Sequence, residues 1–249
     1  MVIFDFLKKL VFPPSCACCG ERLDIFGHEC TDALCRKCRG DWESAKLRIC
    51  KACGMESVDC VCTGKKFDNS RLLSIFKFGN GGSADRFIYV LKRKSNKRFF
   101  SFAIDELYKR LRSEEKLMLI DFSDAYFVNV PRSRKAILEY GFDHAEILAR
   151  GVAGRIGGKY IPALGRRGGG KAQKKLGSDA RSKNVSGKFM YDEDGDLGGK
   201  RVVIVDDVVT TGATVAEAIR VLRENNAGEI TVLCLARTGN SNKNKNKKD

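Results

Sequence analysis

The pattern of apolar and polar positions predicts a short N-terminal helix followed by alternating strands and helices. Ile3, Phe4, Leu7, Leu10 and Val11 recur at helical spacing before the Pro-Pro pair at 13–14 ends the pattern. Apolar runs then predict strands at 71–78, 125–130, 160–164, 202–205 and 230–236, with helical patterns at 84–93, 99–112, 143–155 and 213–223. This alternation is typical of an α/β fold with a parallel sheet flanked by helices.

Changes in composition divide the chain into four segments. Residues 1–14 form the amphipathic helix, 15–66 are rich in Cys, 67–238 contain the α/β pattern, and 239–249 form a basic Asn/Lys tail that we expect to be disordered. We expect the first helix to pack on the rest of the protein; docking to a partner or a membrane surface is the alternative. A Gly- and Lys-rich stretch at 166–184 predicts a functional lid or a disordered loop.

Charge and cysteine content indicate the partners and the cellular compartment to expect for this protein. A net charge of +15 favours polyanionic partners such as nucleic acid or phosphorylated metabolites. Apolar runs are too short for a membrane span, and Asp5, Lys8 and Lys9 do not fit a secretory signal, so we expect a cytoplasmic protein. Thiols stay reduced there, so the 11 cysteines indicate metal binding, with disulfides as the weaker alternative.

The cysteine spacing predicts one or two structural zinc ions. Two C-x-x-C turns separated by 15 residues, Cys16/Cys19 and Cys35/Cys38, match a four-thiolate zinc ribbon. A second set with a less regular spacer predicts another site, formed by Cys50, Cys53, Cys60 and Cys62. Spare donors that can replace one of these ligands are Cys18, His28 and Cys30.

A closed ribbon presents a surface for nucleic acid or protein, and the sequence leaves both open. Trp42 could stack on a nucleic-acid strand while Arg36, Lys37 and Arg39 neutralise it. The same residues could equally be one anchor and a solvated face.

The segment 202–214 (VVIVDDVVTTGAT) predicts a phosphate site. An apolar strand delivers the chain to the carboxyl edge of the sheet, where a Thr- and Gly-rich turn opens a helix and offers N–H groups to phosphate. Two acids beside a phosphate fit sugar hydroxyls or a divalent cation, which together imply a ribose 5-phosphate. The alternative is a capped helix after two chance acids. The candidate ligands are Asp206, Asp207, Val208, Val209, Thr210, Thr211, Gly212, Ala213 and Thr214.

This segment resembles the phosphoribosyl pyrophosphate (PRPP) motif of type I phosphoribosyltransferases. Together with the Cys pairs, it makes residues 12–238 resemble the ComF (competence protein F) family, which joins an N-terminal zinc ribbon to a type I phosphoribosyltransferase-like sheet. The resemblance implies that Asp206 and Asp207 hold the ribose hydroxyls, that 210–214 hold the 5-phosphate, and that Mg²⁺ accompanies the pyrophosphate. It also implies that the loop 166–181 closes over the site. The resemblance to the family is also carried by residues 91–97, Val130-Pro131, Gln173, Arg181, Asn184 and Ala236-Arg237.

One element departs from the family pattern. Where the family commonly reads Arg-Gly-Phe-Asn-Gln, this chain has Tyr140, Gly141, Phe142, Asp143 and His144. A cation and two amides are lost, which puts the role of the element in doubt. His144 is either a general base or, more simply, a polar contact at a helix start.

Two functions follow from the resemblance. The first is transfer of ribose 5-phosphate from PRPP to an acceptor that no residue identifies, with Asp206 and Asp207 as candidate catalytic residues. The released pyrophosphate would then be neutralised by Lys92, Arg93, Lys94 or Arg181. The second is a non-catalytic protein of DNA uptake that binds single-stranded DNA or a motor protein and has a regulatory PRPP site. A weaker third reading is a PRPP-sensing regulator.

Overall fold

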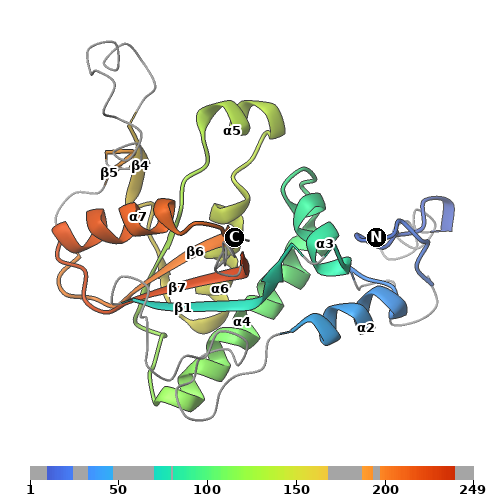
Figure 1. The fold of residues 1–249 in the computed structure, drawn as a ribbon, viewed down its shortest axis with the longest axis horizontal. Helices are drawn as coiled ribbons and strands as arrows, with labels where there is room; N and C mark the ends of the chain where they lie inside the picture. Colours follow the sequence, from blue (N-terminus) through green and yellow to red (C-terminus); the bar gives the residue numbers. More distant parts are fainter. Residues whose placement is uncertain are drawn as a thin grey trace, which may run out of the picture.

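The computed structural model describes residues 10–24, 33–46, 70–79, 81–167, 187–192 and 197–238. Its centre is a parallel five-stranded sheet in the order β1-β7-β6-β2-β3 (Figure 1). This is the α/β fold class that the sequence predicts. The strands are β1 (Arg71–Phe78), β2 (Tyr126–Asn129), β3 (Lys159–Tyr160), β6 (Val202–Val209) and β7 (Ile230–Thr238).

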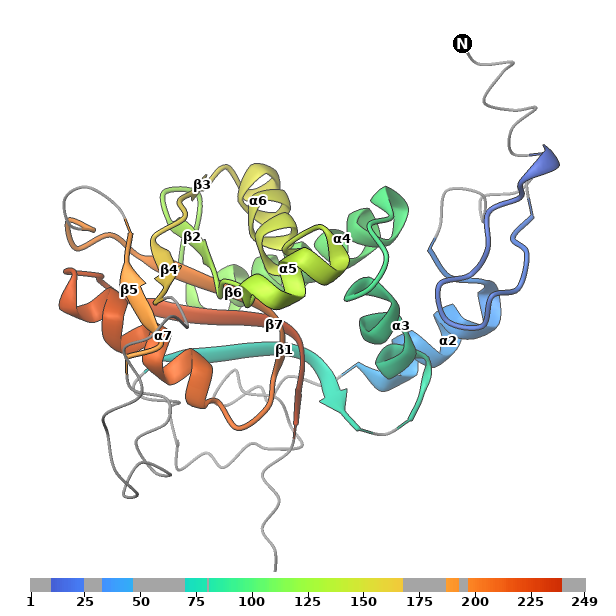
Figure 2. The same cartoon turned by 90° about the horizontal axis from the view of Figure 1, so that it is seen from above.

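Helices cover both faces of this sheet. Figure 2 shows α4 and α6 on one face and α7 on the other, with α2 and α3 beyond one end of β1. A separate antiparallel pair, β4 (Leu164–Arg166) with β5 (Phe189–Tyr191), lies on the α7 side. The helices are α2 (Arg36–Ala45), α3 (Ser83–Leu91), α4 (Lys97–Met118), α5 (Arg134–Tyr140), α6 (His144–Ile156) and α7 (Ala213–Glu224).

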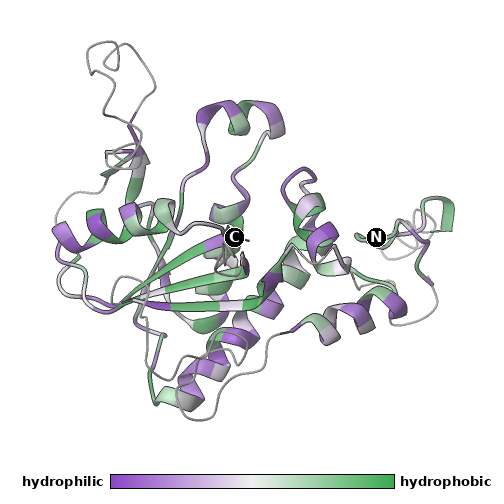
Figure 3. Cartoon of the chain, in the orientation of Figure 1, coloured by the Kyte–Doolittle hydropathy of each residue, from purple (hydrophilic) through white to green (hydrophobic). Residues whose placement is uncertain are grey.

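The central strand β6 shows why the sheet needs helices on both faces. Val203 and Val205 join the core under α4 and α6, while Val202 and Ile204 join the core under α7. Successive strand side chains point to opposite faces, so a strand that begins with four consecutive apolar residues must be buried on both faces there. Figure 3 shows these largely hydrophobic strands between helices that carry both hydrophilic and hydrophobic residues. The same alternation places Asp207 on the face covered by α6.

Most predicted elements are confirmed, although several boundaries differ. The single strand predicted at 160–164 is wrong, because β3 ends at Tyr160 and β4 begins at Leu164 in the other sheet. Pro162 lies between them and has no N–H for a sheet ladder. The sequence interpretation also missed α2, α5 and β5.

Parts of the predicted segments lie outside the described residues. These are 1–9 of the first helix, most of the 166–184 loop, and the tail 239–249. Leu10, Val11 and Phe12, at the end of the first segment, are exposed. Among the described residues, no helix has the length and apolar character that crossing a membrane requires.

Helix α2 joins the cysteine segment to the α/β core through Trp42. Its indole is fully buried, with edge contacts to Phe76, Phe87 and Phe102 at centroid distances of 5.0, 5.2 and 4.9 Å. Its Nε1 donates to Glu106 Oε2 at 2.8 Å. The hypothesis that Trp42 stacks on nucleic acid is therefore wrong, and Trp42 is the anchor.

Replacing this anchor should destabilise the whole protein. We expect Trp42→Ala to lower the free energy of unfolding by about 3–5 kcal/mol, because it leaves a cavity among three aromatic rings. Trp42→Phe should cost less, since it keeps one aromatic ring, although it leaves a smaller cavity and loses the hydrogen bond to Glu106. Urea denaturation measures both, with Leu138→Ala as the control at a 78% exposed position. A loss below about 1 kcal/mol for Trp42→Ala would contradict the buried docking.

Candidate functional site

A pocket of about 290 Å³ lies at the carboxyl ends of β6 and β2. Open parallel sheets bind ligands at this edge. The wall from β2 is formed by 130–133, and the wall from β6 by the acidic pair and the loop before α7. Lys92, His144 and Arg166 complete the lining from three other elements.

The loop between β6 and α7 has the geometry of an anion site. Gly212 caps α7 with φ 76° and ψ −8°, a left-handed conformation that favours glycine. Thr238 Oγ1 donates to the carbonyl of Thr210 at 2.9 Å, which fixes the loop against β7. The unpaired N–H groups at a helix N-terminus attract negative charge. Of the predicted loop residues, Thr210, Gly212 and Thr214 line the pocket, together with Val208 and Val209.

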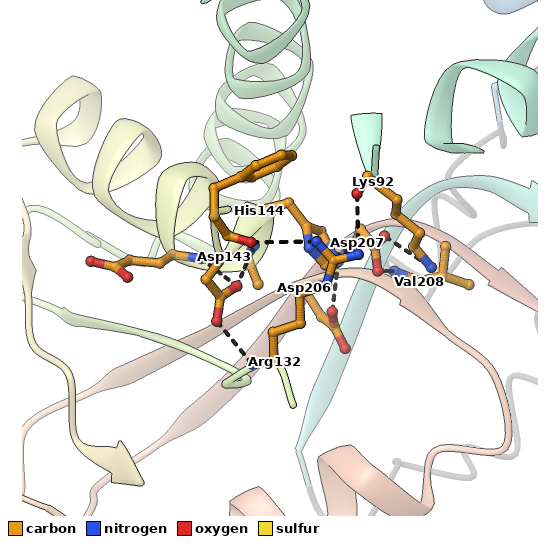
Figure 4. A network of polar contacts seen from close by, with 10 residues as sticks. Lys92, Arg132, Asp143, His144, Asp206, Asp207 and Val208 are labelled. Atoms are coloured by element: carbon orange, nitrogen blue, oxygen red, sulfur yellow. Dashed lines mark hydrogen bonds and ion pairs between the residues drawn. The ribbon is translucent and has the colours of Figure 1, made fainter. Parts of the chain in front are cut away.

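The acidic pair meets two cationic or polar groups from outside β6. Asp207 is 3% exposed, and its Oδ2 lies 3.0 Å from Lys92 Nζ and 3.1 Å from His144 Nε2 (Figure 4). Its Oδ1 accepts from the N–H of Val208 at 2.7 Å, and Asp206 Oδ1 accepts from the N–H of Asp207 at 2.8 Å. Each carboxyl group thus accepts a hydrogen bond from the N–H of the residue that follows it.

These contacts give the two acids opposite pKa shifts. Burial by itself raises the pKa of Asp207, but the contacts with His144 and Lys92 outweigh it and hold this pKa well below its usual range. Burial and, next, the charge of Asp207 raise the pKa of Asp206 well above its usual range. Without a ligand, Asp207 is therefore the readily ionised member of the pair.

The element that departs from the family pattern holds the pocket wall together. Asp143 caps α6 through Oδ1, which accepts from the N–H groups of Ala145 and Glu146 at 3.0 and 3.3 Å. Its Oδ2 accepts from the N–H of Arg132 at 2.8 Å. The cap ties the start of α6, and hence His144, to the segment after β2 (Figure 4).

Arg132 is a pocket residue that the sequence interpretation missed. Its guanidinium donates to the carbonyls of Lys92 and Phe142 at 3.1 and 3.4 Å and lies 4.6 Å from the ring centroid of Tyr140. Tyr140 thus supports a cation in this chain. The available signal was its position directly after Val130-Pro131, at the end of a strand that pairs with β6.

Of the basic segment 91–97, Lys92 is the residue that lines the pocket. Arg93 instead packs on Tyr89, with its guanidinium 3.7 Å from the ring centroid. Arg166, the first residue of the predicted lid, belongs to β4 and donates to the carbonyl of Pro131 at 2.7 Å. Gln173, Arg181 and Asn184 lie outside the described residues.

A second cluster brings together four thiols. The Sγ atoms of Cys16, Cys19, Cys35 and Cys38 lie within 4.8 Å of one another, and those of Cys19 and Cys35 are 3.7 Å apart. Four thiolates about 2.3 Å from a zinc ion have edges of about 3.8 Å, so the cluster fits a metal.

The spare donor Cys18 points elsewhere, because its thiol donates to the carbonyl of Ser83 at 3.1 Å. Burial opposes ionisation of Cys16, but the N–H groups of Cys19, Cys35 and Cys18 outweigh it and lower the pKa of Cys16 to about 7. The other candidate metal ligands, Cys50, Cys53, Cys60, Cys62, His28 and Cys30, lie outside the described residues.

One family model and several known proteins match part of this chain. Residues 136–249 match the model of the phosphoribosyl transferase domain. The DNA utilization protein YhgH of Escherichia coli (strain K12) is 32% identical over 112 residues, which are 45% of this chain and 48% of that protein. YhgH of Salmonella typhi is 33% identical over the same shares. The matched part thus spans about half the length of these curated relatives.

Matches among solved structures include two phosphoribosyltransferases. The purine phosphoribosyltransferase from Pyrococcus horikoshii is 25% identical, with a TM-score of 0.31 over 54% of this chain and 73% of its own. The adenine phosphoribosyltransferase from Saccharomyces cerevisiae is 20% identical, with a TM-score of 0.36 over 57% of this chain and 70% of its own. With the family match, the homology to YhgH and the four-cysteine cluster, the resemblance drawn from the sequence is confirmed.

The unequal acids predict opposite effects of two isosteric substitutions. At neutral pH, Asp207→Asn should lower the free energy of unfolding by about 1–3 kcal/mol, because Lys92 and His144 lose their partner. Asp206→Asn should raise it, because a carboxyl whose charge is disfavoured by burial is removed. Urea denaturation of the ligand-free protein measures both.

The pH dependence follows from the same shifts. The stabilisation from Asp207 is present above its unfolded pKa of about 3.9 and is lost as the pH falls below that value. For Asp206 the sign is opposite, because its pKa in the folded protein is raised. Its contribution to the free energy of unfolding is fully present below its unfolded pKa of about 3.9 and is lost as the pH rises through its folded pKa. If Asp207→Asn and Asp206→Asn lower the free energy of unfolding equally, the opposite pKa shifts of the two acids are wrong.

Proposed function

We propose, for a chain whose residues 136–249 match the phosphoribosyl transferase domain, that the pocket binds PRPP and transfers its ribose 5-phosphate to an acceptor. The observation that supports this most directly is the order of groups along one strand end. Two acids are followed by a left-handed glycine and the N-terminus of α7, all lining one pocket. A sugar phosphate with free hydroxyls fits both parts at once.

Each part of the pocket has a role in this proposal. The N–H groups and hydroxyls of 210–214 bind the 5-phosphate, and Asp206 and Asp207 accept hydrogen bonds from the ribose hydroxyls. Lys92 is 39% exposed on its side chain, so it can leave Asp207 and neutralise the departing pyrophosphate. Arg132 also lines the pocket. Arg181, from the loop, is proposed to bind the pyrophosphate as well.

The donor set also fits Mg²⁺, the ion that the fold family implies. Carboxylate oxygens are the ligands that Mg²⁺ prefers, and Asp206 and Asp207 both line the pocket. When bound with substrate phosphates, Mg²⁺ supplies charge neutralisation.

A link to DNA is the second part of the proposal. It is supported by the homology to a protein named for DNA utilization and by the net charge of +15. The alternative function is a non-catalytic protein that binds single-stranded DNA or a motor protein of DNA uptake, with PRPP as a regulator. Since Trp42 is buried, any strand contact on the cysteine segment would rest on its basic residues. Location in the cytoplasm also stays a prediction.

PRPP with Mg²⁺ should stabilise the protein against thermal unfolding. At a concentration about 100 times the Kd the gain is about 2.7 kcal/mol, which a thermal-shift assay detects. Asp206→Ala combined with Asp207→Ala should remove it. The matched control is Asp124→Ala, an acid of 63% side-chain exposure that precedes β2 at the opposite edge of the sheet.

Pyrophosphate release separates the two functions. Release in the presence of nucleobases or single-stranded DNA that disappears in the double variant supports transfer. Stabilisation by PRPP without release favours the regulatory alternative. If PRPP neither stabilises the wild type nor is turned over, the proposed site is wrong.

The four-thiol cluster is proposed to hold a structural zinc ion. Cys19→Ser should lose one zinc per chain and lower stability, although Cys19 is exposed and adds little to packing. Cys18→Ser is the matched control, one residue away, and should keep the zinc because its thiol contacts Ser83 instead. Metal analysis of the purified variants measures both. Equal zinc in Cys19→Ser and wild type would exclude the cluster as the site.

A further inference from the structure

The imidazole of His144 is buried beside the acidic pair. His144 is 6% exposed, and its Nδ1 has no hydrogen-bond partner among the described residues. Its Nε2 faces the acidic pair and lies 3.1 Å from Asp207 Oδ2, which also lies 3.0 Å from Lys92 Nζ. An imidazole nitrogen and a carboxylate oxygen this close together can also bind one ion.

The positions of these atoms fit a metal ion. His144, Asp206 and Asp207 each offer one ligand atom, and these atoms lie within 4.8 Å of one another (Figure 4). Ligands about 2.1 Å from an ion lie at most about 4.2 Å apart, so a small movement closes the set. We infer that His144, Asp206 and Asp207 bind a first-row divalent transition ion such as Mn²⁺, with the imidazole as a nitrogen ligand.

The donor types select this class of ion. Two carboxylates and one imidazole form a mixed set that suits transition ions and leaves positions open toward the pocket. Mg²⁺, in contrast, prefers oxygen ligands in a regular octahedron.

Lys92 acts as a competitor built into the site. Its Nζ lies 3.0 Å from Asp207 Oδ2, where the ion would bind, and must move away first. Its side chain is partly exposed at the end of α3 and lines the pocket, so there is room for it to move. Two substitutions should then act in opposite directions: His144→Gln removes a ligand, and Lys92→Gln removes a competitor.

The test uses Mn²⁺ alone, without PRPP, so its outcome is independent of the proposed function. Zinc-loaded full-length protein is titrated with Mn²⁺, and free Mn²⁺ is followed by electron paramagnetic resonance. We expect tight binding of one ion, weakened on the order of tenfold or more by His144→Gln and strengthened by Lys92→Gln. Pulsed measurements should show coupling to a histidine nitrogen in the wild type.

The second histidine provides a matched control. The chain has two histidines, so the nitrogen coupling must persist in His28→Gln and vanish in His144→Gln. Absence of Mn²⁺ binding in the wild type, binding without nitrogen coupling, or coupling lost in His28→Gln would each overturn the inference. If His144→Gln does not fold, the wild type and His28→Gln still decide the outcome. PRPP binding with Mg²⁺ can fail while every result here holds.

Discussion

Two neighbouring carboxyl groups at the buried end of the central strand are the constraint on which the site depends. Like charges at this distance in a buried environment cannot both ionise freely. Asp207 stays charged because Lys92 and His144 reach it from α3 and α6, which lie on either side of the pocket. Arg132 then connects these two elements by donating to the backbone of Lys92 and of Phe142. The groups that line this part of the pocket thus meet around the negative charge of Asp207.

The sequence predicts well what local chemistry determines. The apolar run at 202–205 predicts a strand buried on both faces, and the Thr-Thr-Gly turn predicts a helix start with free N–H groups, because both depend on consecutive residues. The split at Pro162 was also readable, since proline cannot donate to a ladder. The phosphate loop was therefore found before any contact between distant elements was known.

Contacts between distant elements are what the sequence did not predict. Trp42 looks the same in sequence whether it stacks on a ligand or fills a core; only the positions of Phe76, Phe87 and Phe102 decide. Arg132 appeared as one basic residue among many in a chain with 46 Lys and Arg. Its role depends on the Asp143 cap and the Tyr140 ring, which lie in the element whose departure from the family pattern suggested a lost function.

Helix α3 joins the two sites. At its start, Ser83 accepts a hydrogen bond from Cys18 and donates one to Asp41 of α2 at 2.9 Å. At its end, Lys92 contacts Asp207 in the pocket. Between them, Phe87 packs on Trp42, so the middle of α3 is fixed by the residue that anchors the cysteine segment. Helix α3 therefore contacts the cysteine segment at its start, α2 in its middle and the acidic pair at its end.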